Sequence, residues 1–230
     1  MTVFYAVLIA IVVRTALYEP FNIPSGSMKP TLLVGDYLFV SKFSYGYSRY
    51  SLPFSLPLVP GRIFASDPER GDVVVFKKPT DNETDYIKRI IGLPGDRIQV
   101  VHGILHINGT PVKRERVADY RLTSDGLVRN VPRYVETLPN GKRHYIIEAS
   151  GDVGMADNTP VFEVPPGHYF AMGDNRDQSQ DSRFREVGFV PQVNLVGRAE
   201  VLFFSIDGSA LKIWEWPKTL RWSRLFSGIE

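Results

Sequence analysis

The sequence has no cysteine among its 230 residues. That absence excludes a disulfide framework, a thiolate nucleophile and any metal site built on thiolates. Neither sign of charge is in marked excess, because 27 basic residues stand against 25 acidic ones and the net charge is +2. The composition therefore gives no electrostatic basis for binding nucleic acid, and we expect none as a partner.

Histidine is also scarce, with only four in the chain, and none lies in a recognisable triad context. Three of them fall in predicted hairpins, so we expect surface positions for them and no catalytic or metal-binding role. A general base, if the chain needs one, must then be sought among other side chains. Amphipathic helical periodicity is weak everywhere after residue 20, which disfavours a helical fold.

An apolar segment occupies the N-terminus: residues 3–13 are unbroken apolar, and Arg14 interrupts a run that continues to residue 18. As a helix, residues 1–18 would extend roughly 27 Å, at the short end for a membrane span. We interpret them as a single transmembrane anchor whose Arg14 side chain reaches one interface. The alternatives are a cleaved secretion signal, which would normally carry a basic first segment, and a buried soluble helix.

The rest of the chain has the pattern of β structure. Gly-Asp followed by an apolar run recurs at residues 35–40, 71–76 and 95–101, which predicts a turn entering a strand each time. Two hairpins are predicted, one turning at Asn108-Gly109 and one at residues 139–141. Further strands are expected at residues 85–91, 169–172 and 196–204. Residues 41–60 are expected to form a long loop or ribbon.

These patterns predict an all-β protein. We divide it into a transmembrane anchor at residues 1–18, a catalytic core formed by residues 19–97 and 165–230, and an inserted β subdomain at residues 98–164. The inserted segment is more polar and richer in turn residues than its flanks.

Two serines follow the anchor in the stretch IPSGSMKP. In an extended chain Ser25 and Ser27 point to the same side, and Gly26 allows close approach of another backbone. One hydroxyl can then attack a carbonyl while the other donates into an oxyanion hole. Taken alone, such a stretch is more often an ordinary loop.

A lysine can serve as the base of a serine nucleophile if burial keeps its amine neutral. In the predicted strand at residues 85–91, alternation places Lys88 on one face with Tyr86 and Ile90. Arg89 on the opposite face also stands between isoleucines, so the pattern leaves open which face is buried. A solvated lysine on an edge strand is the alternative.

A dense polar loop, MGDNRDQSQDSR, follows the predicted strand at residues 169–172. Its likeness to a calcium loop is superficial, because the glycine and the final acid expected at fixed positions are missing. The other interpretations are a support that holds the lysine in place and a solvated turn.

Together, five stretches resemble bacterial signal peptidase I, the Ser/Lys leader peptidase family: PSGSMKPTL, GDYLFVSKFSYG, RGDVVVFKKP, DYIKRIIGLPGD and GDNRDQSQDSR. They occur in the family's order, from the anchor to near residue 204. The combination is highly specific, whereas any single stretch is only suggestive.

The resemblance implies a role for each matching residue. Ser27 would attack the scissile carbonyl, Lys88 would be the general base, and Ser25 with the Ser27 backbone N–H would form the oxyanion hole. Ser179 would orient the Lys88 amine. Ion pairs would support the site through Asp174, Arg89, Asp181 and Arg183.

The resemblance also implies coiled antiparallel sheets in the catalytic core, no cofactor and no metal. The substrates would be secreted preproteins, cut after a small-x-small (Ala-x-Ala) sequence. The enzyme would be a monomer in the inner membrane, in contact with lipid, with its catalytic domain on the extracytoplasmic side. Rival hypotheses are another Ser/Lys protease, of the self-cleaving repressor or pilin-maturation type, and a tethered β-domain that only binds exported chains.

Overall fold

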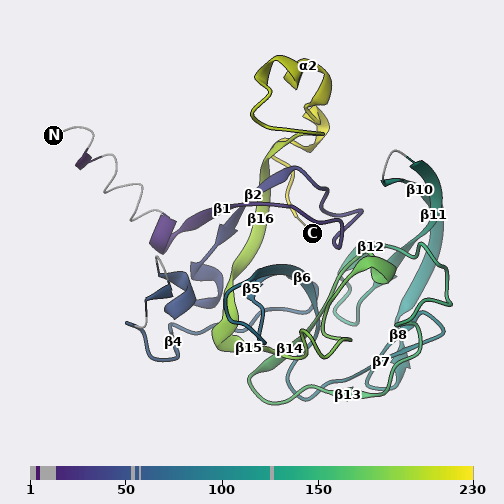
Figure 1. Ribbon diagram of the computed structural model, residues 1–230. Coiled ribbons are helices and arrows are strands. Elements are labelled where there is room, and N and C mark those ends of the chain that lie inside the picture. The colour runs from purple at the N-terminus through teal and green to yellow at the C-terminus, as the bar shows by residue number, and fades with distance from the viewer. Residues whose placement is uncertain (1–3, 6–13, 53–54, 57, 125–126, 230) are drawn as a thin grey trace.

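The computed structural model describes residues 4–5, 14–52, 55–56, 58–124 and 127–229 (Figure 1). The architecture is mostly β with few helices, as the sequence predicts. Every strand pair within these ranges is antiparallel.

A seven-stranded sheet forms the largest layer, and β16, light green in Figure 1, runs between β2 and β5. Its strands follow in spatial order: β1 (Tyr18–Asn22), β2 (Asp36–Ser41), β16 (Leu195–Ser205), β5 (Val73–Lys77), β6 (Asp85–Gly92), β14 (His168–Met172) and β15 (Val190–Pro191).

Two smaller sheets lie at the other side of the molecule (Figure 1). One has the order β13 (Phe162–Glu163), β7 (Arg97–Val101), β8 (Ile104–Ile107) and β9 (Thr110–Pro111). The other has the order β10 (Lys113–Ser124), β11 (Leu127–Thr137) and β12 (Arg143–Ile147). Both are formed within residues 97–163, but the predicted boundaries of an inserted subdomain stay a prediction.

Short elements complete the described chain. β3 (Tyr47–Ser48) pairs with β4 (Arg62–Ile63). Besides the helical residues near the N-terminus, the described chain contains the helical elements η1 (Phe43–Tyr45), η2 (Arg49–Ser51), η4 (Arg176–Gln178), η5 (Gln192–Asn194), η6 (Ile213–Glu215), α2 (Trp216–Thr219) and η7 (Trp222–Arg224).

The three Gly-Asp turns share one geometry. Each glycine, at positions 35, 71 and 95, has a φ between +87° and +96°, a region that other residues rarely adopt. The aspartate that follows accepts a hydrogen bond from the backbone N–H three residues earlier: Leu33 to Asp36, Glu69 to Asp72 and Leu93 to Asp96. Each turn is thereby closed by its own side chain just before the strand begins.

The β5–β6 pair is buried on both faces, which settles what alternation alone left open. Val73 and Val75 of β5 pack into one apolar cluster, whereas Val74 and Phe76 pack into another on the opposite face. Lys88 stands opposite Val74 and Arg89 opposite Val73. Both side chains are therefore enclosed, Lys88 at 3% and Arg89 at 1% exposure.

The predicted transmembrane anchor at residues 1–18 can be compared with the structure only in part. Residues 1–3 and 6–13 of the predicted anchor lie outside the described ranges. Residues 14–16 are helical, but Tyr18 begins strand β1, so the expected helical end at residue 18 is wrong by two residues. Tyr18 instead pairs with Ser41 of β2. Among the residues that the structure describes, no helix is both long and apolar enough to cross a membrane.

Candidate active site

Ser27 lies in the turn between β1 and β2, and the core holds both ends of that turn. Ile23, Met28 and Leu32 are buried in the cluster beneath the sheet. The Ser27 carbonyl accepts a hydrogen bond of 3.0 Å from the backbone N–H of Asn175. The serine is 8% exposed, so its hydroxyl is fixed at a nearly enclosed position.

Lys88 reaches Ser27 from β6. Its Nζ donates to Ser27 Oγ at 2.8 Å and to the Ile87 carbonyl at 2.9 Å. The amine also lies 5.2 Å from the centre of the Tyr86 ring. Burial lowers the pKa of Lys88 to about 8, although the negative charges of Asp181 and Asp174 oppose the shift.

Ser25 stands beside the nucleophile candidate, with 3.4 Å between the two hydroxyl oxygens. Unlike Ser27, it is exposed. An exposed hydroxyl next to an enclosed one is compatible with contact to an incoming chain.

Asp174 and Arg89 form a buried ion pair near Lys88. The guanidinium donates to both carboxylate oxygens, at 2.9 and 2.8 Å, and to the Gly71 carbonyl at 2.7 Å. Thr31 also donates to Asp174. Burial alone would raise the pKa of Asp174, but Arg89 outweighs it and holds that pKa below its usual range.

Asp181 and Arg183 form a second buried pair, at 2.9 and 3.0 Å. Asp181 also accepts the backbone N–H of Gly173 at 2.9 Å. Burial acts to raise the pKa of Asp181, and Arg183 more than offsets that effect, so the carboxyl stays ionised. The pair closes the 173–183 loop upon itself.

Ser179 is 5% exposed and lies near the Asp181 carboxylate. In the described structure no group meets the geometry of a hydrogen bond to its Oγ. In the described structure the Lys88 amine donates to Ser27 Oγ and to the Ile87 carbonyl. The expected contact between Ser179 and Lys88 therefore stays a prediction.

Two further residues position the site, and pattern reasoning missed both. Asn175 donates from its side chain to the Gly26 carbonyl at 3.0 Å, in addition to its backbone bond to Ser27. Gly173 leaves no room for a side chain, because a Cβ there would lie 2.2 Å from Ser179 Oγ and 2.5 Å from the Ser27 carbonyl oxygen. Both belong to the polar loop, but only their tertiary contacts reveal their role.

The expectation of surface histidines is wrong for His144, which is 5% exposed. Its Nε2 lies 3.3 Å from Glu136, which also pairs with Arg176. Burial lowers the pKa of His144 and keeps the ring neutral. The ring is thus part of a structural network, and alternation along a hairpin strand does not distinguish that position from an exposed one.

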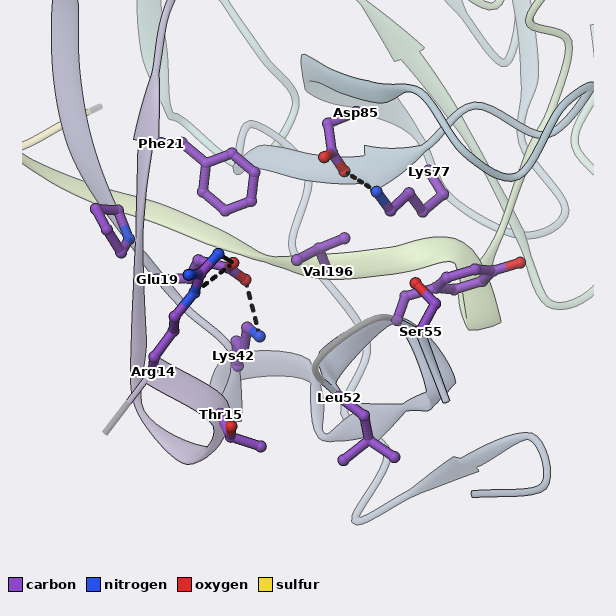
Figure 2. Close-up of a pocket in the computed structure, with 12 residues that line it drawn as sticks. Arg14, Thr15, Glu19, Phe21, Lys42, Leu52, Ser55, Lys77, Asp85 and Val196 are labelled. Carbon is purple, nitrogen blue, oxygen red and sulfur yellow. Dashed lines mark hydrogen bonds and ion pairs between the residues drawn. The ribbon is translucent and has the colours of Figure 1, made fainter. Parts of the chain in front are cut away.

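A cavity of about 560 Å³ lies where the N-terminal segment meets the sheet, and Figure 2 shows its lining. Glu19 pairs there with Arg14 and Lys42, and Lys77 pairs with Asp85. Ser27 and Lys88 do not line this cavity. The candidate active site and this charged cavity are therefore distinct features.

Comparison with known proteins agrees with the motifs. The family model described as "Signal peptidase, peptidase S26" matches residues 1–204. Proteins named signal peptidase I from Rickettsia typhi and Rickettsia canadensis are each 43% identical, over 98% of this chain and 90% of their own.

A crystal structure of a signal peptidase I from Enterococcus faecalis V583 is 26% identical and covers 58% of this chain and 97% of its own, with a TM-score of 0.33. The assignment rests on the family model and the Rickettsia relatives, which match nearly the whole chain. This chain belongs to the signal peptidase family, peptidase S26, and is a serine peptidase.

Proposed function

We propose that this peptidase removes signal peptides from exported preproteins with Ser27 as nucleophile and Lys88 as general base. The observation that carries the proposal is the 2.8 Å contact between Lys88 Nζ and Ser27 Oγ. An ionised lysine could not accept the serine proton, so the base needs a depressed pKa, and burial supplies it.

In the first half of the reaction Ser27 Oγ attacks the scissile carbonyl carbon, and its proton passes to Lys88 Nζ. The negative charge moves to the carbonyl oxygen. The C–N bond then breaks, and the lysine gives the proton to the departing amine, which leaves an ester on Ser27.

The oxyanion would be held by the Ser27 backbone N–H and the Ser25 hydroxyl. The 3.4 Å spacing of the two hydroxyl oxygens supports this role, because Ser25 would then lie near a carbonyl that Ser27 attacks. Its exposure leaves the hydroxyl able to turn towards a substrate that arrives from outside.

In the second half a water molecule attacks the ester. Lys88, neutral again, removes the proton from that water, and the Ser27 oxygen departs and regains a proton from the lysine. The two buried carboxylates, Asp174 and Asp181, are each held by an arginine and stay out of the proton transfer. They position the loop, and their negative charges limit how far burial lowers the pKa of Lys88.

The substrate class follows from the family. We propose cleavage after small-x-small sequences of preproteins, by a monomer held in the inner membrane through its N-terminal segment, with the catalytic domain on the extracytoplasmic side. Ser27 lies nine residues beyond Tyr18, at most about 30 Å along an extended chain, which keeps the site near that surface. Exposed aromatic residues near the C-terminus, Trp214, Trp222 and Phe226, support contact with lipid headgroups.

The test is cleavage of a model preprotein by wild type and by Ser27→Ala. The variant should fold, because the hydroxyl contributes little packing, and should lose all cleavage. Circular dichroism of both proteins checks the fold, and Ser209→Ala, at an exposed position, serves as the matched control. Near-normal turnover by Ser27→Ala would remove the nucleophile and favour a binding-only role for these serines.

A further inference from the structure

Three carboxylates outside the dyad converge at the junction of the small sheets and the polar loop. Glu148 follows β12, Asp157 lies in the loop between β12 and β13, and Asp177 belongs to η4. One oxygen from each lies within 4.8 Å of the other two. Glu148 and Asp157 are each 1% exposed, so two carboxyl groups here are withdrawn from water.

Glu148 Oε2 is buried and has no hydrogen-bond partner among the described residues. The nearest cation to its other oxygen is Arg114, whose Nη1 stands 3.9 Å from Oε1 and is held at 2.9 Å by Asp152. A buried carboxylate oxygen without a partner destabilises a fold, because it has lost its water and gained no hydrogen bond in exchange. A bound cation or a shared proton would satisfy Oε2.

The backbone around the cluster approaches two of the carboxylates closely. The Gly154 N–H donates to Asp157, and the Ser150 N–H donates to Asp177 Oδ2 at 2.6 Å. A Cβ on Gly154 would lie 2.2 Å from Asp177 Oδ1. The loop thus comes as close as a glycine permits, and it fixes two of the three carboxylates in orientation.

We propose that Glu148, Asp157 and Asp177 bind a divalent metal ion of the hard, oxygen-preferring class, calcium or magnesium. Oxygen-only donors suit these two ions, and carbonyl or water oxygens would complete the coordination. This departs from the expectation, drawn from family resemblance, that the protein holds no metal.

The ion would be structural, because it lies among residues that take no part in the dyad. It would tie residues 148–157 to η4, which directly precedes Ser179. The same junction already carries a bridge between Ile147 and Asn175 and a 3.0 Å bond from the Ile147 N–H to the Asp174 carbonyl. The inference does not depend on the proposed chemistry, since its readout is binding and stability.

The rival explanation is a proton in place of the metal. Burial raises the pKa of Glu148 to about 9, against the opposing charge of Arg176, so a protonated Glu148 could share its hydrogen with a neighbouring carboxylate. A metal and a shared proton make opposite predictions for added calcium, which stabilises the fold only if the metal site exists.

The experiment uses the full chain in detergent, stripped with EDTA, and titrates calcium chloride or magnesium chloride while recording the unfolding temperature and the binding heat. Wild type should bind one ion and unfold at a higher temperature. Glu148→Gln should fold without metal, because an amide can donate to Asp157 or Asp177, and should bind roughly ten-fold or more weakly. The matched control is Glu163→Gln, whose side chain is 78% exposed, and it should respond like wild type.

Asp177→Asn provides a second variant at a less buried ligand and should also lose the response. A response to either ion that both ligand variants lose supports the site, and the stronger ion identifies the metal. No binding heat and no temperature shift in wild type would overturn the proposal. Equal responses of wild type and Glu148→Gln would also overturn it, because the ion would then bind elsewhere.

Discussion

Lys88 is the residue on which the proposed chemistry depends. Burial lowers its pKa, whereas the charges of Asp181 and Asp174 limit that decrease. The amine is buried beside the Tyr86 ring and, within the described residues, donates to Ser27 Oγ and to the Ile87 carbonyl. The two nearest carboxylates act on it from a distance, since arginines pair with both. The lysine is therefore neutral often enough to act and is still basic enough to take a proton.

The rate of cleavage should rise with pH through about 8 and then level off, because the neutral amine is the active form. Lys88→Arg should be inactive at every pH, since a guanidinium stays protonated. The measurement is kcat/KM against pH for both proteins.

Lys77→Arg, at a partly exposed lysine that pairs with Asp85, is the matched control and should keep the wild-type profile. An active Lys88→Arg enzyme would contradict the assignment of the base.

His144→Ala tests whether a histidine contributes to the pH dependence. It should lower stability by removing the contact with Glu136, and it should leave the pH profile unchanged.

Ser25→Ala should lower kcat by about 10²–10³ with little change in KM, because an oxyanion donor acts mainly on charge that develops in the transition state. Steady-state kinetics with a soluble signal-peptide substrate measure both parameters. Ser209→Ala is again the control, and an unchanged kcat in Ser25→Ala would remove this hydroxyl from the oxyanion hole.

At the scale of elements, the site is a contact between two loops and one strand. The turn after β1 brings Ser27, β6 brings Lys88, and the 173–183 loop holds both through Asn175 and the Arg89–Asp174 pair. The serine thus depends for its orientation on a segment almost 150 residues further along the chain.

Asn175→Ala should leave Ser27 present but less well oriented. Loss of its bond to the Gly26 carbonyl removes about 1 kcal/mol, and if that energy acts on the reacting geometry kcat should fall about five-fold. KM should change less than kcat. The exposed Asn130→Ala is the control. A lower melting temperature with unchanged kcat would assign Asn175 a purely structural role.

Local patterns were enough to predict β2, β5 and β7, because each follows a Gly-Asp turn and continues as an apolar run, and also β6, β8, β12, β14, β16 and the end of β11. They did not predict β10 or the first part of β11, where charged residues interrupt the apolar pattern. Strand β1 was missed because its apolar start merges with the run assigned to the anchor.

The candidate site shows the same division. Ser27, Lys88 and the two ion pairs come from motifs and are brought together by the fold. Asn175, Gly173 and the Glu148 cluster depend on contacts between distant segments, which no local pattern contains.

At the scale of the whole molecule, the two buried ion pairs make the free energy of unfolding decrease at low pH. The lowered pKa values of Asp174 and Asp181 mean that both carboxyls are ionised in the folded state at pH values where the unfolded chain begins to take up protons. Their contribution is complete above the unfolded pKa of about 3.9 and is lost as pH falls through the lower folded values.

Asp174→Asn should therefore destabilise the protein by about 3–5 kcal/mol at neutral pH, because it removes the carboxylate charge that pairs with the buried Arg89 guanidinium. The difference from wild type should shrink below about pH 4. Denaturant unfolding at several pH values measures it, with the 83% exposed Asp207→Asn as control. A pH-independent difference would mean that the effect is not due to ionisation.

The place of β16 has a consequence for how the enzyme comes into being. This strand lies between β2 and β5 in the sheet, yet it is synthesised long after both. Until residues 173–205 have been synthesised, β2 and β5 lack the strand that joins them in the sheet. Ser27 also lacks its hydrogen bond from Asn175 until then. A nascent chain would therefore have no peptidase activity before that point, even if its N-terminal segment were already in its final location. Activity would appear only when the late segments fold against the early ones.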